Sequence, residues 1–176
     1  MPQMEFHVHV NGEPATLTGD PTEPLLDVLR RHGYMGPKRG CRSGKCGFCT
    51  VTIDGEAEKA CLRPMESLED SRIETIAALG TQDDLHPVQE AFVENAALQC
   101  GFCIPGMIMR SRALLEENPD PSRAEIRSAL SDNLCRCTGY EKIIDAVEDA
   151  AEQLPREVAA DGGVGTAGSE GLGGDP

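Results

Sequence analysis

The 176-residue sequence predicts an α+β protein with two domains, a mixed sheet with one helix followed by a four-helix bundle. Short alternating apolar segments fill the first 76 or so residues, and helical periodicity takes over from about residue 80. Eight cysteines divide into two groups of four, one in each half. We therefore place the first domain at residues 1–79 and the second at 80–155, and we expect the Gly-rich, acidic tail at 156–176 to be disordered.

The chain begins with a predicted β-hairpin. Residues 5–10 alternate between polar and apolar side chains, which is typical of a half-buried strand. Asn11 and Gly12 follow, and this pair is a strong signal for a two-residue hairpin turn. Residues 13–17 then return as a second strand.

One helix and two more strands complete the first domain. Thr22 is a candidate cap for a helix that runs to about His32, and Gly33 stands where a helix often ends. Strands are predicted at residues 50–53 and 72–76. The core face of the helix is expected to carry Leu25, Leu26, Val28 and Leu29. The order of two strands, helix, loop and two strands fits a β-grasp fold of the plant-type ferredoxin kind.

The second half predicts four helices of a small bundle. They span residues 86–97, 105–117 (starting at Pro105), 122–131 and roughly 140–154. In the first, Val88, Ala91, Phe92 and Ala96 are expected to face inward. Ser122 and Glu125 predict a capping box for the third.

The cysteine spacing predicts metal centres. The first group, Cys41, Cys46, Cys49 and Cys61, opens with the C-x4-C-x2-C run that holds a 2Fe–2S cluster in plant-type ferredoxins. The second group is Cys100, Cys103, Cys135 and Cys137. Its C-x2-C pair also suits a zinc ion held by four thiolates, so the spacing alone leaves both metals open there.

The surroundings of the cysteines favour an anionic centre. Both pairs of the second group precede predicted helix starts, where free N–H groups attract negative charge. Glycines at positions 40, 44 and 47 let backbone N–H groups approach the first group. Between Tyr34 and Ile53 there is no acid, but there are Lys38, Arg39, Arg42 and Lys45. These bases could offset the charge of a cluster or bind a partner.

Composition excludes several classes of function. A net charge of −14 disfavours nucleic acid as a partner. No apolar run approaches the roughly 20 residues that span a bilayer, and the N-terminus lacks the pattern of a signal peptide. We therefore expect a cytoplasmic protein whose cysteines bind metal rather than form disulfides. The histidines at 7, 9, 32 and 86 are not placed like ligands.

Three motifs carry a resemblance to a known family. GCRSGKCGFCTVTIDG, QCGFCIPGMI and NLCRCTGY occur in this order, and the resemblance covers roughly residues 4–154. The chain resembles the small iron–sulfur subunit of the molybdenum hydroxylases, a family that includes xanthine dehydrogenase, aldehyde oxidoreductase and aerobic carbon monoxide dehydrogenase.

The resemblance implies an electron-transfer subunit with two 2Fe–2S clusters, one on each cysteine group. It also implies a large subunit that carries molybdopterin and a medium subunit that carries FAD, in a heterotrimer whose further dimerisation is left open. Electrons are expected to enter at the second group and leave from the first. Gln99 and Cys100 become candidates for contact with the pterin. No catalytic residue is expected in this chain.

Two other functions stay open at this point. The chain could be a free-standing ferredoxin-like carrier or a zinc-stabilised interaction module. The sequence also departs from the family at Phe48, where a small residue is common, at Ile104, and at Ala77-Ala78. These departures concern surfaces between domains and partners rather than the cysteines.

Overall fold

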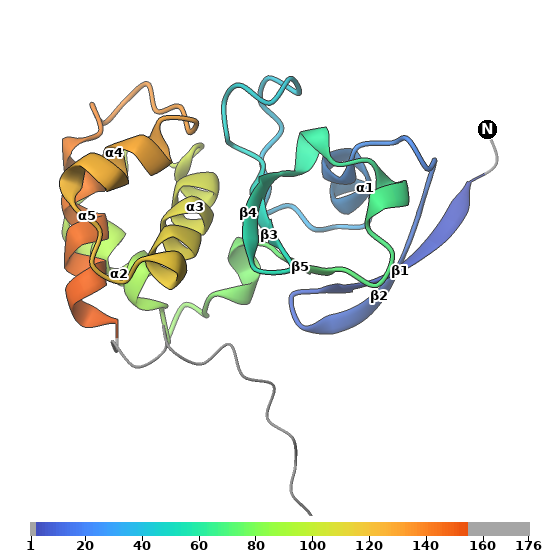
Figure 1. The fold of residues 1–176 in the computed structure, drawn as a ribbon, viewed down its shortest axis with the longest axis horizontal. Coiled ribbons are helices and arrows are strands. Elements are labelled where there is room, and N and C mark those ends of the chain that lie inside the picture. Colours follow the sequence, from blue (N-terminus) through green and yellow to red (C-terminus); the bar gives the residue numbers. More distant parts are fainter. Residues whose placement is uncertain (1–2, 155–176) are drawn as a thin grey trace, which may run out of the picture.

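A computed structural model describes residues 3–154 and has two domains packed side by side (Figure 1). The sheet domain carries α1, and the helical domain contains α2 to α5. The predicted tail at 156–176 lies outside the described residues. Within residues 3–154, no helix is long and apolar enough to cross a bilayer.

The sheet domain contains five strands, one more than predicted. They are β1 Met4–Val10, β2 Glu13–Gly19, β3 Thr50–Ile53, β4 Glu56–Lys59 and β5 Arg72–Glu74. Their order is β2-β1-β5-β3-β4, with β1 parallel to β5 and all other pairs antiparallel. The expected turn at Asn11 and Gly12 forms with positive φ at both residues, and Asp54 and Gly55 form a second turn with the same feature. β4 is the return strand of the second hairpin.

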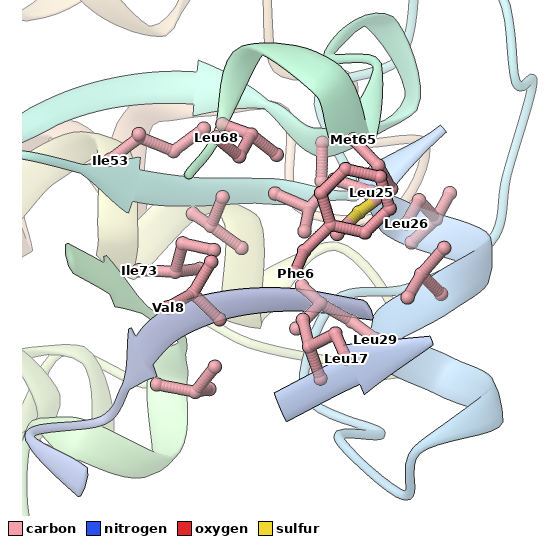
Figure 2. Packing of buried hydrophobic residues seen from close by; sticks show 14 of the residues in the cluster. Phe6, Val8, Leu17, Leu25, Leu26, Leu29, Ile53, Met65, Leu68 and Ile73 are labelled. Carbon is pink, nitrogen blue, oxygen red and sulfur yellow. The ribbon is translucent and has the colours of Figure 1, made fainter. Parts of the chain in front are cut away.

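The helix α1 (Leu25–Arg31) packs on this sheet and closes the first core. Its four predicted apolar residues are buried in one core with residues of β1 and β2, and Figure 2 shows Leu25, Leu26 and Leu29 around Phe6 and Leu17. The predicted cap at Thr22 is wrong. The helix begins after Pro24, which is extended, and Thr22 instead donates its backbone N–H and its hydroxyl to Asp20.

The helical domain has the four predicted helices, with small differences at the ends. They are α2 Pro87–Glu94, α3 Ile104–Glu117, α4 Arg123–Leu130 and α5 Glu141–Gln153. The capping box of Ser122 and Glu125 is present. Ala96 does not face inward as predicted: α2 ends before it, its φ is +46°, and Ala97 is buried in its place. His86 caps α2 through its ring nitrogen.

Short 3-10 helices fill the connections. They are η1 Ala60–Leu62, which contains Cys61, η2 Met65–Ser67, and η3 Ile76–Ala78 in the link between the domains. The segment predicted as a strand to residue 76 therefore ends at Glu74 and turns into η3.

The two domains meet where α3 packs on β3. Gly106 of α3 lies so close to the first cysteine loop that an added Cβ would stand 2.3 Å from the carbonyl oxygen of Gly47. Ion pairs flank this contact: Arg112 of α3 binds Glu74 at 2.7 Å, and Lys59 binds Asp132 at 3.1 Å. The domains are thus joined by backbone packing that only a glycine permits.

Replacing Gly106 with alanine is expected to destabilise the protein. Helix propensity alone would add about 1 kcal/mol of stability, but the new methyl group must displace the backbone of the first loop, which typically costs about 1–3 kcal/mol. Urea unfolding of the iron-loaded protein measures the balance. A variant more stable than the wild type would contradict the close approach.

Candidate metal centre

The first cysteine loop turns its backbone N–H groups toward its sulfurs. Ser43 and Lys45 donate their N–H groups to the Sγ of Cys41 at 3.4 and 3.3 Å, and the N–H of Cys41 points to the Sγ of Cys46 at 3.4 Å. Positive φ angles at Arg42, Gly44 and Gly47 produce the reversals that this requires. The loop is therefore shaped to hold negative sulfur.

The loop packs closely on itself at Gly40. A Cβ there would stand 2.8 Å from the Sγ of Cys46 and 2.5 Å from the ring of Phe48. Cys46, Cys49 and Cys61 are buried, whereas Cys41 is exposed. Cys61 arrives from η1 and closes the first group from the opposite side of the loop.

The second group forms between the starts of two helices. Cys103 is the N-cap residue of α3, and Cys135 and Cys137 lie just before α5. The Sγ atoms of Cys100 and Cys137 are 3.6 Å apart. The two segments thus meet as the sequence predicted, with Cys103 and Cys135 buried and Cys100 and Cys137 exposed.

Polar side chains brace this second loop. Thr138 donates its hydroxyl to the Sγ of Cys135 at 3.1 Å, and the backbone N–H of Cys135 donates to the hydroxyl of Tyr140 at 2.7 Å. Gln99, the candidate for pterin contact, is exposed and donates its side-chain amide to the carbonyl of Cys137 at 3.0 Å. Gln99 and Cys100 therefore lie at the surface beside Cys137.

The eight thiols are arranged in pairs. Neighbouring thiols are Cys41 with Cys46, Cys49 with Cys61, Cys100 with Cys137, and Cys103 with Cys135. Among residues 3–154, no three metal-binding side chains converge on a point that would hold a single ion. A zinc site needs all four thiolates around one centre, whereas a 2Fe–2S cluster takes two at each iron. The pairing fits the cluster better.

The ionisation of the thiols differs sharply with burial. Burial raises the pKa of Cys49 and of Cys103 to about 12. Hydrogen bonds from Ser43 lower the pKa of the exposed Cys41 to about 6. Burial works against ionisation of Cys135, but hydrogen bonds from Thr138 hold its pKa below the usual range. Cys49 and Cys103 therefore keep their protons at neutral pH unless a metal displaces them.

A direct hydrogen bond connects the two cysteine loops. The N–H of Leu134, next to Cys135, donates to the carbonyl oxygen of Cys46 at 2.9 Å. Beside it, the buried Asn133 donates its side-chain amide to the carbonyl of Gly47 at 3.0 Å. The backbones of two candidate ligands, one from each group, are thus separated by a single residue and a single hydrogen bond.

An aromatic pair forms a second bridge between the loops. The rings of Phe48 and Phe102 meet edge to face, with centroids 5.3 Å apart. Each lies between two cysteines of its own group. In the sequence, Phe48 stood out only because the family commonly has a small residue there. Asn133 and Tyr140 did not stand out, because no local sequence pattern indicates which distant residues they contact.

Two family models match the chain in succession. Residues 8–75 match the 2Fe-2S iron-sulfur cluster binding domain, and residues 75–148 match the 2Fe-2S binding domain. Among curated proteins, one of the subunits of nicotinate dehydrogenase from Pseudomonas putida is 45% identical over 85% of this chain and 96% of its own. The xanthine dehydrogenase iron-sulfur-binding subunit of Escherichia coli O157:H7 is 41% identical over 80% and 89%.

Solved structures agree with these matches. A chain of quinoline 2-oxidoreductase from Pseudomonas putida 86 superposes with a TM-score of 0.82 at 43% identity, covering 86% of this chain and 96% of that one. Aldehyde oxidoreductase from Desulfovibrio gigas gives a TM-score of 0.81 at 42% identity, over 84% of this chain and 17% of the longer one. The predicted fold class is confirmed in both domains.

Replacing Cys135 with serine is expected to remove one of two iron centres. The hydroxyl is a poorer iron ligand than a thiolate, while the first group keeps all four cysteines. EPR of the reduced protein should lose one of two distinct signals, and iron per chain should fall by about half. Ser128→Ala in α4 serves as a control, and loss of both signals would show that the centres are not independent.

The aromatic bridge can be measured with a double-mutant cycle. Phe48→Ala and Phe102→Ala should each lower the free energy of unfolding, and their coupling should be about 0.5–1.5 kcal/mol, as is usual for edge-to-face pairs. Chemical unfolding of the four proteins gives this value directly. Strictly additive effects would mean that the rings do not join the two loops.

Proposed function

The chain belongs to the iron–sulfur small subunits of the molybdenum hydroxylase family, and from this premise we propose that it carries two 2Fe–2S clusters and conducts electrons between partner subunits. It is thus a subunit of an oxidoreductase, and we propose that the chemistry takes place on a partner subunit. When bound, each cluster supplies a carrier that takes up and releases one electron at a time.

We propose that each cysteine group holds one cluster. The first would use Cys41, Cys46, Cys49 and Cys61, and the second Cys100, Cys103, Cys135 and Cys137. The thiols contributed by distant segments support this assignment, since every pair in the second group joins the start of α3 to the loop before α5. The domains would be residues 1–79 and 80–155.

The main support for electron transfer between the two cysteine groups is one hydrogen bond. The N–H of Leu134 donates to the carbonyl oxygen of Cys46 at 2.9 Å. It gives the two ligand sets a short connection through backbone atoms, and the packing of Gly106 on Gly47 holds that connection in place. The carbonyl of Gly47 beside this path accepts hydrogen bonds from Thr50 and from Asn133, so it is not left unpaired.

We propose that electrons enter at the second group and leave at the first. The donor would be molybdopterin on a large subunit, and the acceptor would be FAD on a medium subunit. Exposure supports the entry point, because Cys100, Cys137 and Gln99 share one surface of the helical domain. Gln99 holds the carbonyl of Cys137 and is the candidate for contact with the pterin.

Relatives serve enzymes named for nicotinate, quinoline, xanthine and aldehydes. The substrate of this protein would therefore be determined by its large subunit.

Metal analysis and purification test this function together. About four irons and four sulfides per chain are expected, with uptake of two electrons on reduction. From its native host, the chain should purify with molybdenum and flavin. An iron-loaded chain without partners would favour a free carrier, and zinc at either site would favour an interaction module.

A further inference from the structure

A basic face lies beside the first cysteine loop of this acidic chain, and its four arginines line one hollow. Its six bases are Arg30, Arg31, Lys38, Arg39, Arg42 and Lys45, and we call this set the arginine face. The chain as a whole has a net charge of −14, and residues 81–155 carry 14 acids against 6 bases. The arginine face is therefore a local reversal of charge.

Carboxylates neutralise only part of this face. Arg39 and Arg42 both pair with the carboxylate of Asp27, and the distance from Arg39 is 2.7 Å. Because two positive charges share one negative charge, one positive charge is not neutralised. Arg31 is paired with Glu23 at 2.6 Å.

The other three bases make no such pairs. Arg30 donates to the carbonyl of Pro37 at 2.8 Å, and Lys38 donates to that of Met35 at 3.1 Å. These acceptors are neutral. In the described part of the chain, no carboxylate lies within ion-pair distance of Arg30, Lys38 or Lys45. The arginine face thus keeps an excess of about four positive charges.

The face is also hollowed. A depression of about 520 Å³ is lined by four of the arginines together with Glu23, Asp27 and Met35. Met35 is 52% exposed. An exposed apolar side chain next to unneutralised cations is suited to a protein surface that brings carboxylates beside its own apolar contact.

The position of the face links it to electron transfer. Cys41, the exposed cysteine of the first group, stands in the chain between Arg39 and Arg42. Its Sγ accepts the N–H of Lys45 at 3.3 Å. A partner held by these side chains would therefore rest beside the sulfur that is nearest to solvent in the first group.

We infer that the arginine face is the docking surface for an acidic surface of the protein that takes electrons from this chain. The inference builds on the proposed function, to which it adds the chemistry of recognition. Electrons would pass outward one at a time: a cluster held by the first group would give up one electron, and the acceptor would be reduced by one electron. Charge steers the partner to Cys41 and away from the acidic remainder of the molecule.

Small acceptors of opposite charge test the local field. The dithionite-reduced, iron-loaded chain is mixed with ferricyanide, a trianion, or with hexaamminecobalt(III), a trication, at about 10 mM and about 300 mM salt. Lys45→Glu breaks no ion pair and should slow oxidation by ferricyanide about threefold to tenfold at low salt, without slowing oxidation by the cobalt complex. High salt should remove the difference.

Charge changes elsewhere provide the control. Lys142→Glu alters the charge by the same amount on α5 and should leave the ferricyanide rate within about twofold of the wild type. Arg136→Glu makes the same change of charge beside the second group of cysteines and serves as a second control. If either control slows ferricyanide as much as Lys45→Glu does, or if Lys45→Glu has no effect, the arginine face does not guide the acceptor.

The complex purified from the native host tests docking itself. Lys38→Glu combined with Lys45→Glu should lower the flavin retained per chain at least about threefold at moderate salt, while molybdenum is retained. If the variant keeps its flavin at every salt concentration, docking through this face is wrong although the proposed function stands. If even the wild type purifies without molybdenum or flavin, the proposed function itself fails.

Discussion

The close packing of Gly106 against Gly47 determines how near the two cysteine groups can lie. Because there is no side chain at this position near the start of α3, the helix rests directly on the backbone of the first loop. This places Leu134 within hydrogen-bonding distance of Cys46 and brings the rings of Phe48 and Phe102 together. A bulkier residue at the contact would disturb all three interactions, so the path between the groups depends on packing rather than on the cysteines alone.

The two cysteine loops differ in the charged and hydrogen-bonding groups that surround them. The first loop points N–H groups at its sulfurs and has bases beside it, whereas in the second loop the hydroxyl of Thr138 donates to the Sγ of Cys135. Hydrogen bonds to sulfur and nearby positive charge both favour the reduced state of a bound cluster. The two sites therefore stabilise negative charge by different means. Two bound clusters would for this reason have different reduction potentials.

Local signals in the sequence predicted most of the fold. The hairpin at Asn11-Gly12 and the capping box of α4 depend on neighbouring residues and formed as expected. Thr22 failed because Pro24 delays the helix, and β4 was missed because Glu56–Lys59 is polar and is held as a strand by β3. The two segments that carry the second group of cysteines lie together, with the Sγ atoms of Cys100 and Cys137 3.6 Å apart. The contact of Asn133 with Gly47 spans 86 residues, and no local pattern specifies such a partner.

The pairing of thiols has a consequence for how the protein is made. Each pair in the second group joins a cysteine near residue 100 to one near residue 136, so a cluster bound there would lack a ligand at each iron until synthesis has passed Cys137. The first group, by contrast, is complete at Cys61. Once the helical domain docks, Leu134 and Asn133 donate hydrogen bonds to the first loop. During synthesis, the first group would therefore be ready for iron well before the second.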